Sequence, residues 1–222
     1  MTNLTLFSLC AHFLFSSSPF YLLNRYHQSF LFCNSYLSRS FSSIIFSNSH
    51  IQKTLIHTNI FSHALKSSIF LNDSEDIILN SLKTDQSQRF TETSREGNIT
   101  IVNCIFENCR SEVGGALYIT QNCSVTIYGT TFKKCYAYEG SGGYISQYYN
   151  FRDSPKDSNE FISGIKIEYC CFFECLREDN ESILYNMGFG CSLVVDAEDS
   201  SLLYVTEYNN THKDEMSYGA HF

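Results

Sequence analysis

The stretch ITIVNCIFENCRSEVGGALYIT, residues 99–120, is followed by a second copy of its pattern, VTIYGTTFKKCYAYEGSGGYIS, at residues 125–146. Apolar and polar residues alternate at the start of each copy, which is typical of a strand whose side chains point to two faces. Phe106 and Phe132 lie 26 residues apart in the sequence. A fixed period of this size predicts stacked structural units, each too small to bury its own apolar face.

A pair of glycines closes each copy. Aligning Gly114-Gly115 with Gly142-Gly143 places two extra residues in the second copy. Glycine suits turns that need a positive φ angle or a close approach of two backbones. Each unit is therefore predicted to consist of strand, turn, strand and turn.

A third copy is recognisable in IKIEYCCFFEC, residues 165–175. The surplus before it falls at 147–161, where Asp, Ser, Pro and Asn predict a loop insertion. A fourth, weaker copy places Tyr208 at the aromatic position and Tyr218-Gly219 at the glycine position.

Strands that repeat in this way and stack parallel to one another form a β-helix, in which like residues build columns along the stack. The sequence thus predicts an all-β, parallel β-helix solenoid of about 26-residue coils, with about five to eight coils in all. The repeat positions are Ile99, Ile101, Phe106, Cys109, Gly114, Gly115, Val125, Ile127, Phe132, Cys135, Gly142, Gly143, Ile165, Ile167, Phe172 and Cys175.

The residues around GGALY, 114–118, are similar to the short repeats of polymorphic outer-membrane-type proteins. The signatures of that family are GGA followed by Ile or Leu, and Phe-x-x-Asn, which Phe106 and Gly114 begin here. Tyr144 replaces the alanine in the second copy, and Cys109 stands where the family has asparagine. The resemblance implies a right-handed parallel β-helix that is displayed outside the cell and associated with adhesion.

Charge is distributed unevenly along the 222 residues, whose net charge is −8. No Asp or Glu occurs before Asp73. A net acidic chain disfavours nucleic acid as a partner, since nucleic acid binds basic surfaces. No run reaches about 18 apolar residues, so no transmembrane segment is predicted.

The first 98 residues are harder to phase. Residues 1–18 contain an apolar run and are predicted to be either a signal peptide or an N-terminal cap. The Ser- and Phe-rich region 19–98 is predicted to form early coils, because Ile56 and Phe61 fall in register with the repeats, and 99–222 the β-helix proper.

Cysteine and acidic residues are the candidates for chemistry. The column of Cys109, Cys135 and Cys175 is predicted to be a ladder of buried thiols, with disulfides as the alternative. Cys170 and Cys171 point to opposite faces of a strand, so neither a metal site nor a cofactor is predicted.

Catalysis on a polysaccharide would need two carboxylates about 5–10 Å apart. One acid, Glu168, occurs in the two columns predicted to point outward from the first strand of each unit, Thr100/Thr126/Lys166 and Val102/Tyr128/Glu168. Acidic residues elsewhere are interpreted as solvated loop charge: Asp153, Asp157, Asp196, Glu198, Asp199, Asp214 and Glu215.

Aromatic residues gather at the insertion, at Tyr144, Tyr148, Tyr149 and Phe151. They form either a binding patch or the packing of the loop against the coil beneath it. The hypothesis favoured by the sequence is a non-catalytic surface or secreted scaffold that binds an extracellular glycan or a host protein. The alternatives are a polysaccharide-active enzyme, a lyase or glycosidase, and an incomplete, non-functional copy of an expanded surface-protein family.

Overall fold

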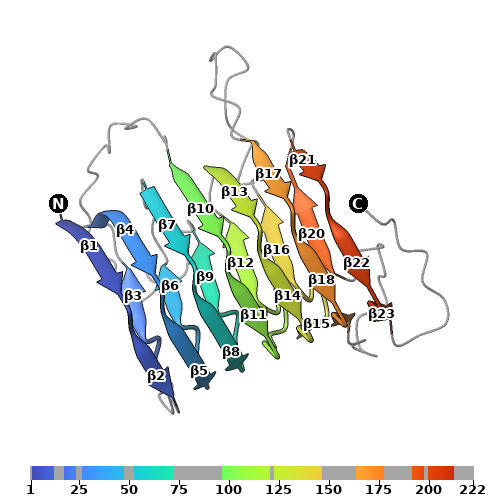
Figure 1. Ribbon diagram of the computed structural model, residues 1–222, viewed down its shortest axis with the longest axis horizontal. Helices are drawn as coiled ribbons and strands as arrows, with labels where there is room; N and C mark the ends of the chain where they lie inside the picture. Colours follow the sequence, from blue (N-terminus) through green and yellow to red (C-terminus); the bar gives the residue numbers. More distant parts are fainter. Residues whose placement is uncertain are drawn as a thin grey trace, which may run out of the picture.

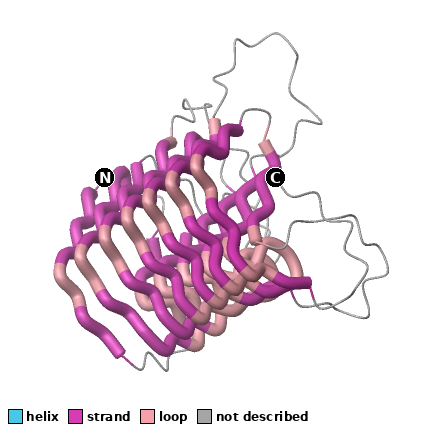
Figure 2. Tube along the Cα trace, turned by 45° about the vertical axis from the view of Figure 1, so that its right-hand side comes forward, coloured by secondary structure: helices cyan, strands magenta, loops and turns pink. Residues whose placement is uncertain are grey.

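The computed structural model describes residues 2–12, 18–23, 27–47, 53–72, 97–120, 123–146, 164–177, 192–197 and 200–212. Throughout these ranges the regular structure is β-strand, and the paired strands are parallel. Successive strands of one sheet lie side by side along the long axis of the molecule (Figure 1). Figure 2 shows the chain winding repeatedly through strands and short turns.

Three sheets form the walls of the coil, and a small fourth sheet adds to it at the C-terminal end. Sheet A contains β1 (Thr2–Phe7), β4 (His27–Cys33), β7 (Lys53–His57), β10 (Asn98–Val102), β13 (Ser124–Tyr128), β17 (Ile165–Glu168) and β21 (Ser200–Leu203). Sheet B contains β2 (Cys10–His12), β5 (Tyr36–Ser40), β8 (Ile60–Ala64), β11 (Ile105–Glu107), β14 (Thr131–Lys133), β18 (Cys171–Phe173) and β22 (Thr206–Tyr208). Sheet C contains β3 (Tyr21–Leu23), β6 (Ile45–Ser47), β9 (Ile69–Asn72), β12 (Leu117–Thr120), β16 (Gly143–Ser146) and β20 (Leu193–Asp196). Sheet D contains β15 (Tyr136–Ala137), β19 (Leu176–Arg177) and β23 (Thr211–His212).

The predicted all-β parallel β-helix is therefore confirmed. Sheets A and B each have seven strands, one for each described coil. Six of the seven described coils contribute three wall strands rather than the two expected, because the Phe position occupies a strand of its own. In the first repeat that strand is β11, which carries Phe106.

The register of the repeats follows the sequence columns through sheets A and B. Ile99 pairs with Val125, and Val125 with Ile165. Phe61 pairs with Phe106, so the assignment of Ile56 and Phe61 to an earlier coil is confirmed.

The alignment of the glycine pairs was wrong. Leu117 pairs with Gly143, so the structural equivalent of Gly114 is Gly140 and the 26-residue spacing continues without an insertion. Gly114 and Gly140 both adopt left-handed conformations, with φ of 60° and 56°. A Cβ atom on Gly114 would lie 2.0 Å from the Leu117 carbonyl oxygen, and one on Gly140 2.2 Å from that of Gly143. Each turn therefore requires glycine at its first position.

The placement of Tyr208 at the inward aromatic position was also wrong. Phe172 pairs with Glu207, whereas Tyr208 pairs with Phe173 on the outer face. Side chains point alternately to the two faces of a strand, so a shift of one residue exchanges inside for outside. Tyr218 and Gly219 lie outside the described residues.

The core is a narrow column of apolar side chains between the three walls. Its most regular part is a stack of four buried phenylalanines, Phe61, Phe106, Phe132 and Phe172. Neighbouring ring centroids are 5.0, 5.2 and 4.7 Å apart, and the planes are within 9° of parallel. Burial of each ring contributes about 1.5–3 kcal/mol, and each ring pair adds about 0.5–1.5 kcal/mol.

The N-terminal residues belong to the same stack. β1 pairs with β4, β2 with β5 and β3 with β6, so residues 2–12 begin the first described coil and β3 completes it. Residues 20–47, which sequence could not phase, supply β3–β6. Whether residues 1–18 are removed as a signal peptide stays a prediction. No helix in the described part of the chain is long and apolar enough to cross a membrane.

Candidate functional site

Three tyrosines form an exposed cluster where sheet A turns into sheet B in the C-terminal coils, and we call this cluster the tyrosine corner. Tyr128 ends β13, while Tyr169 and Tyr204 follow β17 and β21. Their exposed fractions rise along the stack, from 41% to 52% and 72%. The rings of Tyr169 and Tyr204 stack with centroids 4.8 Å apart, and Tyr128 meets Tyr169 edge-on at 5.2 Å.

The backbone at this corner has a left-handed conformation in every described coil. In earlier coils the position is held by Ser8, Asn34, Thr58, Asn103 and Gly129, and of these residue types asparagine and glycine tolerate it best. Tyr169 and Tyr204 occupy it in the last two described coils, each with φ of 54°. A bulky side chain in this conformation is an outlier that costs roughly 1–2 kcal/mol.

The backbone ladder holds these two tyrosines in place. The Gly129 amide donates to the Glu168 carbonyl at 3.0 Å, and the Tyr169 amide donates to the Leu203 carbonyl at 3.0 Å. The coil therefore continues its hydrogen bonds through the corner and fixes the conformation that Tyr169 and Tyr204 would otherwise avoid. The rings are presented outward on a rigid support.

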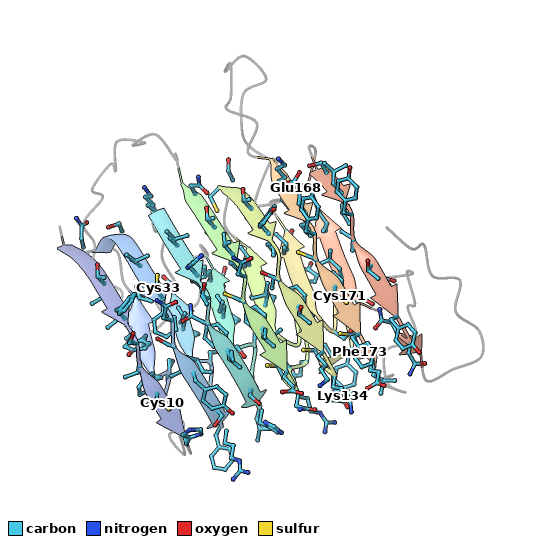
Figure 3. All side chains as sticks on the ribbon, viewed as in Figure 1. Cys10, Cys33, Lys134, Glu168, Cys171 and Phe173 are labelled. Atoms are coloured by element: carbon cyan, nitrogen blue, oxygen red, sulfur yellow. The ribbon has the colours of Figure 1, made fainter. Side chains whose placement is uncertain are left out.

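A second aromatic stack lies further along the same coils, on the outer face of sheet B. Phe173 and Tyr208 stack with centroids 5.2 Å apart and planes within 4° of parallel. Cys171 and Thr206 lie between the two stacks, since the outward side chains of β18 and β22 alternate with the inward ones. Figure 3 shows Glu168, Cys171 and Phe173 in this order along the C-terminal coils. The outer surface thus presents two aromatic columns with a short strip between them.

Charged side chains near this surface are paired with one another. Glu168 binds Lys166 at 3.1 Å, and Glu174 binds Lys134 at 3.3 Å. On the neighbouring coils Glu107 binds Lys133 at 2.9 Å, and this hydrogen bond raises the pKa of the Lys133 ammonium. Carboxylates bridged to lysines are suited to polar contacts at the rim of a binding surface.

The sequence-predicted patch of Tyr144, Tyr148, Tyr149 and Phe151 is described only at Tyr144. The Tyr144 ring stacks on Tyr118 with centroids 5.5 Å apart, in an outward column on sheet C. On its other side Tyr144 pairs with Val194, so its ring lies within the column rather than at its end. The other three residues lie outside the described residues, so the loop patch stays a prediction.

Sequence reasoning missed Tyr169 and Tyr204 as site residues. A signal for them was present, because Tyr169 stands at the place that Asn103 and Gly129 take in the repeat. A tyrosine that replaces asparagine or glycine at a turn is unusual and could have been noticed. The acidic residues expected in loops lie outside the described ranges, except Asp196, which ends β20.

The column of Cys109, Cys135 and Cys175 is buried, as predicted. The nine cysteines in the described part of the chain have free thiols. Burial raises the pKa of the central thiol, Cys135. No group of three or more His, Cys, Asp or Glu side chains in these parts of the chain is placed to hold a metal ion.

Fold and surface together define a class of protein, a parallel β-helix whose outer wall carries stacked aromatic side chains. The chain belongs to the family described as the right handed beta helix region, which matches residues 40–219. No curated protein matches it, and no solved structure does.

Proposed function

We propose that this protein is a non-catalytic β-helix scaffold that acts outside the cell and binds an extracellular glycan at the tyrosine corner. The observation that carries the proposal is the pair of exposed, stacked tyrosines, Tyr169 and Tyr204, in left-handed backbone conformations. Backbone strain of this kind concentrates at functional sites, where the surrounding structure maintains it.

The chemistry of tyrosine suits such a ligand. A tyrosine ring provides a rigid apolar surface at low conformational cost, and its hydroxyl group donates and accepts hydrogen bonds. The outer face of the Tyr204 ring is not covered by a further described coil, and 72% of the residue is exposed. The Glu168–Lys166 pair next to the corner supplies polar groups for sugar hydroxyls.

Binding is favoured over catalysis by the arrangement of the acids on sheets A and B. Glu107, Glu168 and Glu174 each lie within 3.3 Å of a lysine ammonium. A general acid and a nucleophile would instead be two neighbouring carboxylates with different environments.

The test is binding of the full chain to a panel of immobilised polysaccharides. Replacing both tyrosines, Tyr169→Asn/Tyr204→Asn, should weaken binding at least about tenfold, because two hot-spot rings are lost while the turn conformation is favoured. The matched control is Thr58→Asn, the same substitution at the same turn position in an earlier coil, where φ is 54°. It should leave binding unchanged.

Two results would contradict this proposal. Undiminished binding by the double variant would move the site elsewhere, and its loss in Tyr148→Ala/Tyr149→Ala would place it at the loop patch. Release of new sugar ends from a polysaccharide would instead establish the enzyme alternative.

A further inference from the structure

Cys10 and His12 lie on the outer face of β2 in the first described coil, and Ser38 lies beside them in the next coil. The Cys10 Sγ atom is 3.5 Å from His12 Nε2, and His12 Nδ1 is 2.8 Å from Ser38 Oγ. The His12 ring also packs against Tyr36 with centroids 4.9 Å apart. A thiol, an imidazole and a hydroxyl are thus connected in series, with the middle group held from two sides.

The hydrogen bond to Ser38 is compatible with the form of the imidazole that can act as a base towards Cys10. When Nδ1–H donates to the Ser38 oxygen, the lone pair of Nε2 faces the Cys10 thiol and accepts its proton. A nucleophile beside a base that a third group orients is the arrangement of an activated nucleophile. Cys10 is exposed, so a reagent in solution can reach it.

We propose that Cys10, in a chain that retains residues 1–18, is a thiol–disulfide exchange site, activated by His12 and oriented through Ser38, whose substrate is a low-molecular-weight disulfide. The proton of the Cys10 thiol moves to His12 Nε2, and the thiolate attacks one sulfur of the disulfide. A new S–S bond joins Cys10 to that sulfur as the original S–S bond breaks. The departing thiolate takes the proton from His12, so one thiol and one disulfide give one mixed disulfide and one thiol.

The chain contains a natural control for this site. Cys171 stands in the same outward column of sheet B as Cys10, with four strands between β2 and β18. The residue two positions after Cys171 is Phe173, which corresponds to His12 in that column. Figure 3 shows Cys10 and Cys171 at opposite ends of the stack. The two thiols share a strand geometry and differ in the neighbouring base, and Cys171 is also the less exposed of the two.

The other described thiols are poor competitors, because all of them except Cys171 are buried. Burial raises the pKa of Cys104 and of Cys170 to about 11, which keeps both protonated. Burial also raises the pKa of Cys33 and of Cys171, although Cys171 is only half-buried. Thiolate character and access together decide which cysteine reacts.

The experiment is the reaction of the full folded chain with oxidised glutathione, followed over time by intact mass and peptide mapping. We expect Cys10 to form the mixed disulfide first, at least about tenfold faster than Cys171. His12→Phe copies the surroundings of Cys171 and should slow Cys10 by a similar factor. Equal rates at Cys10 and Cys171, or an unchanged Cys10 rate in His12→Phe, would overturn the proposal.

The converse variant tests whether the geometry is sufficient. Phe173→His/Tyr208→Ser rebuilds the same three groups around Cys171, because Tyr208 stands beside Phe173 as Ser38 stands beside His12. Its Cys171 should react several-fold faster than in the parent chain. No gain, in a variant with unchanged strand circular dichroism, would show that position along the stack rather than the imidazole sets reactivity, and would overturn the proposal.

Discussion

The N-terminal and C-terminal coils fill the same inner corner in different ways. Just before each sheet B strand lies one inward position, which Leu9 and Val205 fill in the first and last described coils. The five coils between them carry small polar or thiol side chains there. In the N-terminal coils it is Ser35 and Asn59, whose amide and hydroxyl groups bond to the backbone of neighbouring coils. In the C-terminal coils it is Cys104, Thr130 and Cys170, of which the two cysteines are buried thiols.

A shared hydrogen bond explains why such different residues fit. The Ser35 hydroxyl donates to the Cys33 carbonyl two residues earlier, at 2.9 Å. The thiols of Cys104 and Cys170 contact the carbonyls two residues before them, at 3.4 and 3.3 Å. In the five middle coils this corner holds a small side chain with a donor, which at Ser35, Cys104 and Cys170 adds a second hydrogen bond to a carbonyl that already accepts a backbone amide. Several small residues with a donor fit this corner, and the N-terminal and C-terminal halves differ in which of them they use.

The largest effect is expected where the C-terminal half depends on its phenylalanine stack. Phe132→Ala should destabilise the protein by about 3–5 kcal/mol, because it removes two ring contacts and leaves a cavity between Phe106 and Phe172. Leu37 fills the same column in the N-terminal half. Phe132→Leu should therefore cost less, about 1–1.5 kcal/mol.

Urea unfolding monitored by circular dichroism measures both variants. An equal loss for Phe132→Ala and Phe132→Leu would show that stacking, rather than filled volume, stabilises this half. The two halves would then differ in the interaction that stabilises their core as well as in the residues that form it.

Alkaline pH should destabilise the two halves unequally. Burial holds the pKa of Cys104 and of Cys170 at about 11, against an ordinary value of 9.0. Between these values the unfolded chain has lost protons that the folded chain retains, so stability is complete below pH 9 and falls as the pH rises towards 11. Each thiol contributes roughly 2–3 kcal/mol to this loss.

Urea midpoints at pH 8 and about pH 10.5 measure the effect. The control is Cys104→Thr/Cys170→Thr, which copies the natural residue Thr130 of the same column and removes both thiols. If the alkaline loss persists unchanged in that variant, it comes from other groups and the thiols do not distinguish the halves.

Much of this fold could be predicted from the sequence, because apolar and aromatic residues recur at the same spacing in each repeat. The columns of Ile99 and Phe106 follow from a spacing of 26 and from alternation along strands, and both are properties of the chain alone. The glycine register could not be settled in the same way. The sequence allows Gly114 to be aligned with either Gly140 or Gly142. Only the strand pairing shows that Gly140 is its equivalent and shares its left-handed conformation.

The candidate site was harder to predict for a physical reason. Tyr169 and Tyr204 matter because of the backbone angle at which they are held, and a side-chain pattern does not encode that angle. The activated thiol was hidden in a different way. Cys10 and His12 are neighbours in sequence, but Ser38 joins them only after the chain has completed one coil.

The smallest expected effect is a gain in stability. It is tested at one turn position, which Thr58 occupies in the N-terminal half and Tyr204 in the C-terminal half. Tyr204→Asn and Thr58→Asn each place asparagine at a left-handed position now held by a less suited residue, so each should stabilise the protein by about 0.5–1 kcal/mol. Thermal unfolding of the full chain measures both. If the tyrosine is retained for binding, Tyr204→Asn gains stability and weakens binding of the polysaccharide, whereas Thr58→Asn gains stability alone. A Tyr204→Asn variant that is less stable than the parent would show that stacking on Tyr169 outweighs the strain, and the tyrosine corner would then be part of the structural support of the last coils.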